Sequence, residues 1–220
     1  MNTEVRDQPG TTETRGGYPR GAPEEAAAAS AVSASPAAAA AEADGWPDVP
    51  GDTALTIRVP EANPLVRAGF PAHVTVLYPF LDVSRLTSAT HAELAELFAA
   101  QDPFTFTFGE FRRYPGVLYL PPAPDAPVRA LTRSLTTRWP EALPYRGIFH
   151  PPLAPHLTLA NHEGPDTYEA AYDALERRLA PHLPLVSHVT SVQLIVTDGP
   201  GKGWRDLAEY RLGTGGPTAV

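Results

Sequence analysis

The chain has 220 residues, 43% of them hydrophobic and 19% charged, a balance typical of a soluble globular protein. It contains no cysteine, which excludes disulfides, thiolate metal sites and cysteine nucleophiles. Residues 1–50 carry eight acidic and three basic residues, and the rest of the chain carries 17 acidic and 14 basic residues. This nearly neutral body excludes a protein that coats long nucleic acid, and we expect no binding of long duplexes.

Residues 1–50 are predicted to form a disordered tail rich in alanine and proline. They include only six bulky apolar residues, and 13 of the 22 residues from 22 to 43 are alanine. Such a segment buries too little surface to offset its ordering entropy. Glu24 and Glu25 stand where a signal peptide needs a basic start, and Pro36 interrupts a weakly apolar run. We therefore expect a cytoplasmic protein that does not enter membranes.

The folded domain is predicted to span residues 51–213, followed by a short flexible tail at 214–220. Alternating apolar and β-branched residues indicate strands, and apolar residues at helical spacing indicate helices. In chain order, the first half is predicted to contain strands over 53–59 and 73–78, a helix from Asp82 or Ser84 to about Gln101, strands over 104–108 and 117–120, and a helix from Pro127 to just before Pro140.

The second half repeats this order. It is predicted to contain a strand over 155–160, a helix from Pro165 or Asp166 to Ala180, and strands over 186–196 and 204–212. His73 and His156 are 83 positions apart, and so are Val83 and Asp166, which lie near the two predicted helix starts. An offset of this length is too long for a solenoid repeat and favours a duplicated lobe.

Two of the aligned strands carry the same tripeptide, His73-Val74-Thr75 and His156-Leu157-Thr158. Positions i and i+2 of a strand lie on one face, so each imidazole is expected beside its own hydroxyl. A duplicated lobe would bring the two faces together across a pseudo-twofold axis. One histidine could then act as general base and the other as general acid, while the two hydroxyls bind phosphate oxygens.

A third tripeptide of this kind, His188-Val189-Thr190, is interpreted as non-catalytic. Only the first two follow a proline (Pro71 and Pro155) and lead into a helix at a common offset. His150 and His162 flank the second motif and stay open as substrate contacts. No local cluster offers three metal ligands and no glycine-rich phosphate loop is present, so we expect neither a metal nor ATP as a cofactor.

The sequence around both motifs resembles the two-histidine (2H) phosphoesterase superfamily, in particular its 2′-5′ RNA ligase-like family. The resemblance covers roughly residues 53–213 and rests on three segments: 72–80 (AHVTVLYPF), 155–160 (PHLTLA) and the closing hairpin at 192–212. It implies an α+β fold, with a bilobal, pseudo-twofold duplicated domain in which two antiparallel β-sheets line a central cleft and helices lie outside.

The resemblance also implies a function. It places catalytic histidines at His73 and His156 and phosphate-binding threonines at Thr75 and Thr158, in a metal-independent enzyme. The expected substrates are 2′,3′-cyclic phosphates or 2′-5′ linkages of nucleotides or RNA ends. The direction of the reaction, and which histidine is the base, stay open. The alternative is a non-catalytic module that binds nucleotides or RNA ends on the same fold. In either case we expect a monomer.

Overall fold

The computed structural model describes residues 48–66, 71–114, 116–149, 152–161, 168–200 and 202–213. All of them belong to one compact unit, residues 33–220. The predicted N-terminal tail, apart from residues 48–50, and the predicted C-terminal tail lie outside the described residues. No described helix is long and apolar enough to cross a lipid bilayer.

The described strands are all antiparallel to their neighbours. They are β1 (Thr53–Arg58), β2 (His73–Leu77), β3 (Phe104–Phe108), β4 (Arg112–Tyr114), β5 (Val117–Leu120), β6 (Leu157–Asn161), β7 (Leu185–Val189), β8 (Ser191–Thr197) and β9 (Trp204–Arg211). They form one sheet of order β2-β1-β8-β9, one of order β4-β5-β6, and a β3-β7 pair. The predicted α+β class with antiparallel sheets is confirmed, with three sheets among the described residues in place of the expected two.

The helices are α2 (Ser88–Ala99), α3 (Ala126–Arg138) and α4 (Tyr168–Leu179). Helix α2 starts later than predicted, because the predicted cap, Asp82, begins a separate short helix before it. The Asp82 carboxylate accepts a hydrogen bond from the Ser84 N–H at 2.8 Å and caps only a 3₁₀ turn, Val83–Arg85. Thr87 then caps α2, accepting from the Thr90 N–H at 3.1 Å.

The other two helices agree with the apolar spacing of the sequence. Pro127 lies in the first turn of α3, where its missing N–H costs nothing, and Leu131 and Leu135 are buried. In α4, Leu175 and Leu179 are buried in the same way. The start predicted for α4, at Pro165 or Asp166, lies outside the described residues.

The strand predicted over residues 186–196 is wrong, because the chain changes sheets within it. It divides into β7, which pairs with β3, and β8, which lies between β1 and β9. At the break, the carbonyl of Thr190 accepts a hydrogen bond from the Leu212 N–H at 2.9 Å. Burial alternates along β7 and along the first half of β8, but its phase shifts by one residue at the break, and no glycine or proline marks this position in the sequence. The short strand β4 was also not predicted, since its three residues show no apolar alternation.

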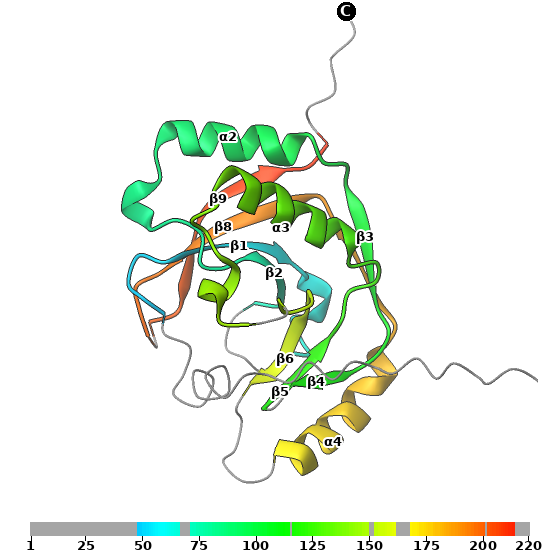
Figure 1. Ribbon diagram of the computed structural model, residues 1–220. Coiled ribbons are helices and arrows are strands. Elements are labelled where there is room, and N and C mark those ends of the chain that lie inside the picture. The colour runs from blue at the N-terminus through cyan, green and yellow to red at the C-terminus, as the bar shows by residue number, and fades with distance from the viewer. Residues whose placement is uncertain are drawn as a thin grey trace, which may run out of the picture. The chain divides into compact units, whose positions relative to one another are not determined.

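One face of the four-stranded sheet packs on the main core, and the positions between the core residues carry the polar side chains of the first motif and a small separate apolar cluster, Ala54, Tyr78 and Ile195. Leu55, Ile57, Val74 and Leu194 are buried in the main core, and Phe98 of α2 stacks on Tyr210 of β9, with 5.6 Å between ring centroids. Figure 1 shows α2 running alongside β9. Because side chains alternate along a strand, the residues between these core positions lie on the opposite face.

Strands β2 and β6, which carry or adjoin the two His-x-Thr motifs, are the edge strands of different sheets and contact each other. Helix α3 packs on β2, and the Thr132 hydroxyl donates a hydrogen bond to the Val76 carbonyl oxygen at 2.7 Å. The fold therefore brings together two strands about eighty residues apart and covers one of them with α3 (Figure 1).

Candidate active site

The first motif lies on β2 with the predicted division of faces. Val74 and Val76 are buried in the core, whereas His73 and Thr75 are only partly buried. Across the antiparallel pair, His73 lies opposite Arg58 and Thr75 lies opposite Thr56. The expectation that His73 and Thr75 share the less buried face of one strand is confirmed.

The second motif has the same division at the start of β6. Leu157 and Leu159 are fully buried, and His156 and Thr158 are partly buried. The ladder with β5 begins at Leu157, so His156 precedes the strand by one residue instead of lying within it as predicted. Thr158 lies opposite Tyr119.

The two histidines are held by equivalent hydrogen bonds. The Nδ1 atom of His73 lies 2.9 Å from the carbonyl oxygen of Pro71, and Nδ1 of His156 lies 2.8 Å from the carbonyl oxygen of Ala154. A carbonyl oxygen only accepts, so each Nδ1 donates its proton. In the neutral ring this leaves the lone pair on Nε2, which makes Nε2 the atom able to take up a proton.

Both imidazoles are neutral at pH 7 in the free protein. Burial is the main cause that lowers the pKa of His73 to about 4, and the charges of Arg58 and His156 lower it further, while the hydrogen bond to Pro71 raises it. Burial also lowers the pKa of His156, against the hydrogen bond to Ala154. The charge of His156 is thus one of the causes that lower the pKa of His73, which is consistent with the contact between β2 and β6.

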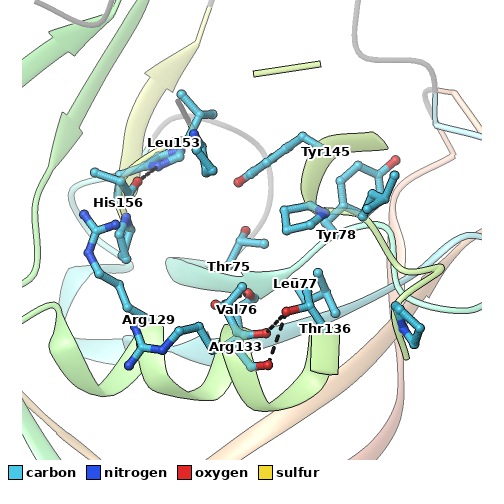
Figure 2. A pocket seen from close by; sticks show the side chains of 17 residues that line it. Thr75, Val76, Leu77, Tyr78, Arg129, Arg133, Thr136, Tyr145, Leu153 and His156 are labelled. Carbon is cyan, nitrogen blue, oxygen red and sulfur yellow. Dashed lines mark hydrogen bonds between the residues drawn. The ribbon is translucent and has the colours of Figure 1, made fainter. Parts of the chain in front are cut away.

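A cavity of about 470 Å³ adjoins these residues. Thr75 from the first motif and His156 from the second both line it, together with residues of α3 and of the two segments 143–145 and 152–155 (Figure 2). His73 and Thr158 are not among its lining residues. The structure thus brings one member of each motif, Thr75 and His156, to the cavity wall.

Tyr145 is a residue of the site that the sequence did not indicate. Its hydroxyl is hydrogen-bonded to the side chain of Thr75, and burial raises its pKa to about 12, so it stays protonated. The Tyr145 N–H donates to the Tyr78 carbonyl oxygen at 2.6 Å, and the Tyr145 ring packs edge-on against Phe149 at 5.4 Å between centroids. Figure 2 shows the Tyr145 side chain directed towards Thr75.

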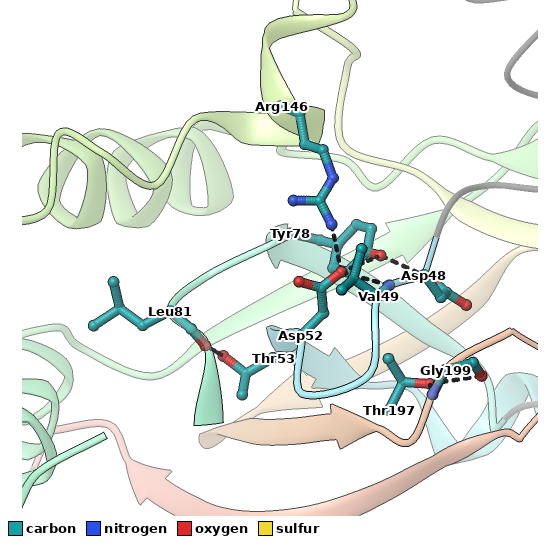
Figure 3. Close-up of polar contacts among 9 residues, drawn as sticks. All are labelled: Asp48, Val49, Asp52, Thr53, Tyr78, Leu81, Arg146, Thr197 and Gly199. Atoms are coloured by element: carbon teal, nitrogen blue, oxygen red, sulfur yellow. Dashed lines mark hydrogen bonds and ion pairs between the residues drawn. The ribbon is translucent and has the colours of Figure 1, made fainter. Parts of the chain in front are cut away.

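The turn that carries Tyr145 has an unusual backbone. Tyr145 and Arg146 both have left-handed conformations, with φ of 48° and 54°, which for residues other than glycine cost about 1–3 kcal/mol each. An ion pair from Arg146 to Asp52 holds the turn in place (Figure 3). Asp52 also accepts hydrogen bonds from the Val49 N–H at 2.9 Å and from the Tyr78 hydroxyl at 3.4 Å. Strain of this kind, held by surrounding contacts, is typical of functional sites.

Two further tyrosines pack against His156. The rings of Tyr114 and Tyr119 stack at 4.5 Å between centroids, and both meet the His156 ring edge-on, at 5.8 and 5.4 Å. The neighbouring Arg113 is bound to α4 through Asp173 and Glu176, at 2.6 and 2.8 Å. These aromatic contacts limit the orientation of His156 in addition to its hydrogen bond.

The third tripeptide lies away from the cavity. His188 is exposed on β7, where its Nδ1 is hydrogen-bonded to the Thr105 hydroxyl at 2.9 Å across the β3-β7 pair. His150 and His162 lie outside the described residues. Within the described ranges, no group of three histidine, aspartate or glutamate side chains is arranged to hold a metal ion.

An antiparallel α+β fold with two His-x-Thr segments on adjoining edge strands defines the two-histidine phosphoesterase class. A family model for the 2′-5′ RNA ligase superfamily matches residues 27–201. The chain belongs to this superfamily.

The fold is also similar to that of Escherichia coli LigT, solved in complex with 3′-AMP, with 18% identity and a TM-score of 0.50 over 74% of this chain and 99% of LigT. The protein TT0787 of Thermus thermophilus gives 18% identity and a TM-score of 0.49 over 75% of this chain and all of TT0787. A search of curated protein sequences gave no significant match.

Proposed function

We propose that this protein is a metal-independent phosphodiesterase that opens 2′,3′-cyclic phosphates of nucleotides or RNA ends, or makes and cleaves 2′-5′ linkages. His73 and His156 are the general base and general acid. The observation that supports this most strongly is the shared Nδ1–carbonyl hydrogen bond of the two histidines, because it leaves both Nε2 atoms as the proton-exchanging positions.

In the hydrolytic direction, one imidazole takes a proton from water as its oxygen attacks phosphorus. The bond from phosphorus to one ribose oxygen breaks, and the other imidazole donates a proton to that oxygen. Each transfer typically contributes about 10²–10⁴-fold to the rate. Thr75 and Thr158 donate hydrogen bonds to the non-bridging phosphate oxygens, where charge develops. With a ribose hydroxyl in place of water as the nucleophile, the same step forms a phosphodiester linkage, and its reverse cleaves that linkage to the cyclic phosphate.

The general acid acquires its proton when the substrate binds. Burial keeps both histidines neutral in the free protein, with the pKa of His73 at about 4. A phosphate anion beside an imidazole favours the charged form and raises its pKa. We therefore expect binding of a phosphate-bearing ligand to take up about one proton near pH 7.

The two motif strands have matching irregularities, which support the proposed duplication around a central cleft. The ladder between β1 and β2 has a bulge between Leu55 and Thr56, and Thr56 lies opposite Thr75. The ladder between β5 and β6 has a bulge between Leu118 and Tyr119, and Tyr119 lies opposite Thr158. The cross-strand pair of Thr105 and His188 has the same separation of 83 residues as the two motif histidines. A twofold axis through that pair would relate β2 to β6.

A nucleotide substrate is consistent with the similarity to LigT, which was solved with 3′-AMP. The full chain should convert adenosine 2′,3′-cyclic phosphate to a single adenosine monophosphate, and a strong chelator should leave the rate unchanged. A panel of cyclic nucleotides and 2′-5′ dinucleotides would define the linkage. Binding of these compounds without turnover would favour the non-catalytic module, and turnover that needs a divalent ion would replace this mechanism.

A further inference from the structure

The cavity extends past Thr75 and His156 to two arginines of α3. Arg129 and Arg133 are four positions apart, on the same side of the helix, and both line the cavity. In Figure 2 the Arg129 side chain extends from α3 towards His156, and the Arg133 side chain lies along α3 below it. Helix α3 is fixed there by the Thr132 hydrogen bond to Val76 of β2. The distance of the arginines from the motif strand is therefore set by the fold.

The charge of this part of the cavity is positive. Its described lining residues include Arg129 and Arg133 and no aspartate or glutamate. Arg129 has an exposed ion pair with Asp125 at 2.7 Å, on the preceding turn. Among the described residues, no carboxylate lies within ion-pair distance of Arg133. Like charges at positions i and i+4 slightly destabilise a helix, so helix stability does not account for this pair.

The remaining wall of the cavity is largely apolar. Leu143 and Pro144 from one segment and Leu153 and Pro155 from another line the cavity there. A volume of about 470 Å³ lies in the range of small-molecule sites and exceeds the needs of a cyclic phosphate alone. The cavity therefore suits a ligand with a planar, weakly polar body and an anionic group placed apart from the reacting phosphate.

We propose that Arg129 and Arg133 bind a second phosphate group of the substrate, distinct from the phosphate that reacts at the histidines. This inference rests on the proposed function for its reacting end. The substrate class is then a nucleoside cyclic phosphate that carries a further phosphate. The guanidinium groups make charge-assisted hydrogen bonds to that phosphate, and the apolar wall accepts the base.

A second phosphate has two sources, a terminal 5′-phosphate or the phosphodiester of an oligonucleotide. The test compares kcat/KM of the full chain on adenosine 2′,3′-cyclic phosphate, on its 5′-phosphorylated form, and on a dinucleotide that ends in the same cyclic phosphate. At least one of the latter two should react about tenfold better or more, with a gain that weakens as salt is raised. Equal kcat/KM values on all three would overturn the proposal.

Substitutions test whether the two arginines cause the higher kcat/KM on substrates with a second phosphate. Arg129→Gln and Arg133→Gln should each reduce the ratio between phosphorylated and unphosphorylated substrates severalfold, and the double variant should bring it close to one. Arg177→Gln is the matched control, since it removes the same charge from an exposed position of α4. It should keep the ratio. A ratio that falls equally in Arg177→Gln would show a general charge effect and contradict the site.

Binding measurements separate this inference from the proposed function. Calorimetry should give a Kd for adenosine 3′,5′-bisphosphate about tenfold or more below that for 3′-AMP, and the difference should be lost in the Arg129→Gln/Arg133→Gln variant. If no cyclic compound is hydrolysed but this difference is found, the phosphate site stands and the proposed reaction fails. If the two ligands bind equally, the phosphate site is wrong whatever the activity.

Discussion

The Nδ1 atoms of His73 and His156 make the same hydrogen bond, each to the carbonyl oxygen two residues earlier in the chain, at 2.9 and 2.8 Å. The acceptors are the carbonyls of Pro71 and Ala154, which precede two strands from different sheets. The two histidines therefore have the same tautomer and present the same atom, Nε2. A pair of proton carriers requires this equivalence, since each must act in either direction of a reversible reaction.

The hydroxyl of Tyr145 is expected to hold Thr75 in position. Tyr145→Phe removes one hydrogen bond, so kcat should fall about 2–10-fold with little change in the pH profile, because neither proton carrier is altered. Steady-state kinetics on a cyclic nucleotide would measure this. Tyr210→Phe is the matched control, since it removes a buried hydroxyl that is bound to His91. An equal loss in both variants would assign the effect to stability.

The ion pair between Asp52 and Arg146 should hold the turn that carries Tyr145, and thereby keep Tyr145 in contact with Thr75. Asp52→Asn removes the charge that faces Arg146 in the strained turn, and we expect it to lower the free energy of unfolding by about 1–3 kcal/mol. It should also lower kcat, because the Tyr145 turn loosens. Thermal unfolding and kinetics would be measured together. The control, Glu141→Gln, breaks an exposed pair with Arg85 and should change neither quantity.

The pH dependence of kcat/KM follows from the lowered pKa values of the two histidines. Activity requires one neutral and one protonated imidazole, and kcat/KM reports the pKa values of the free protein. Both lie below the ordinary 6.5, that of His73 at about 4. The value of kcat/KM should therefore peak below about pH 6.5 and fall as the pH rises further. The optimum of kcat should lie at higher pH, because bound phosphate raises the pKa of the acid. A peak of kcat/KM above pH 7 would contradict this.

The same shift should make the protein sensitive to acid. When the pKa of a histidine is lower in the folded than in the unfolded state, the unfolded state binds more protons at pH values between the two pKa values. In that range the free energy of unfolding decreases as the pH falls. For His73 the free energy of unfolding should decrease as pH falls from 6.5 to about 4, by at most ~3 kcal/mol, and this contribution should be absent above pH 7. Chemical denaturation at pH 5 and pH 7.5 would show a smaller difference for His73→Gln than for the wild-type protein.

Local sequence patterns were sufficient for most of the elements and for the polar faces of the motifs. The alternation around His73 and around His156 indicated which side chains face away from the core, and burial agrees at both strands. The pattern failed at the strand predicted over 186–196, where the choice of pairing partner decides the structure. Residues 185–197 contain no glycine or proline, yet Thr190 marks a change of sheet that depends on partners far away in the chain.

Tyr145 could not be found from the sequence for a similar reason. It lies in a short proline–glycine segment, and its contact with Thr75 crosses seventy positions of the chain. The left-handed backbone that directs it depends on the Arg146–Asp52 ion pair, which joins the segment to the start of β1. Arg129 and Arg133 likewise show ordinary helical spacing, and only the position of α3 over β2 brings them to the cavity.

The central claim is that His73 and His156 act as one catalytic pair, and three single variants test it most directly. On adenosine 2′,3′-cyclic phosphate with a chelator present, His73→Ala and His156→Ala should each lose at least about 10²-fold in kcat. The double variant should be little worse than either, because the pair works as a unit. His188→Ala, which alters an exposed histidine of β7, should keep most of the activity. An inactive His188→Ala beside an active His73→Ala or His156→Ala would contradict the account.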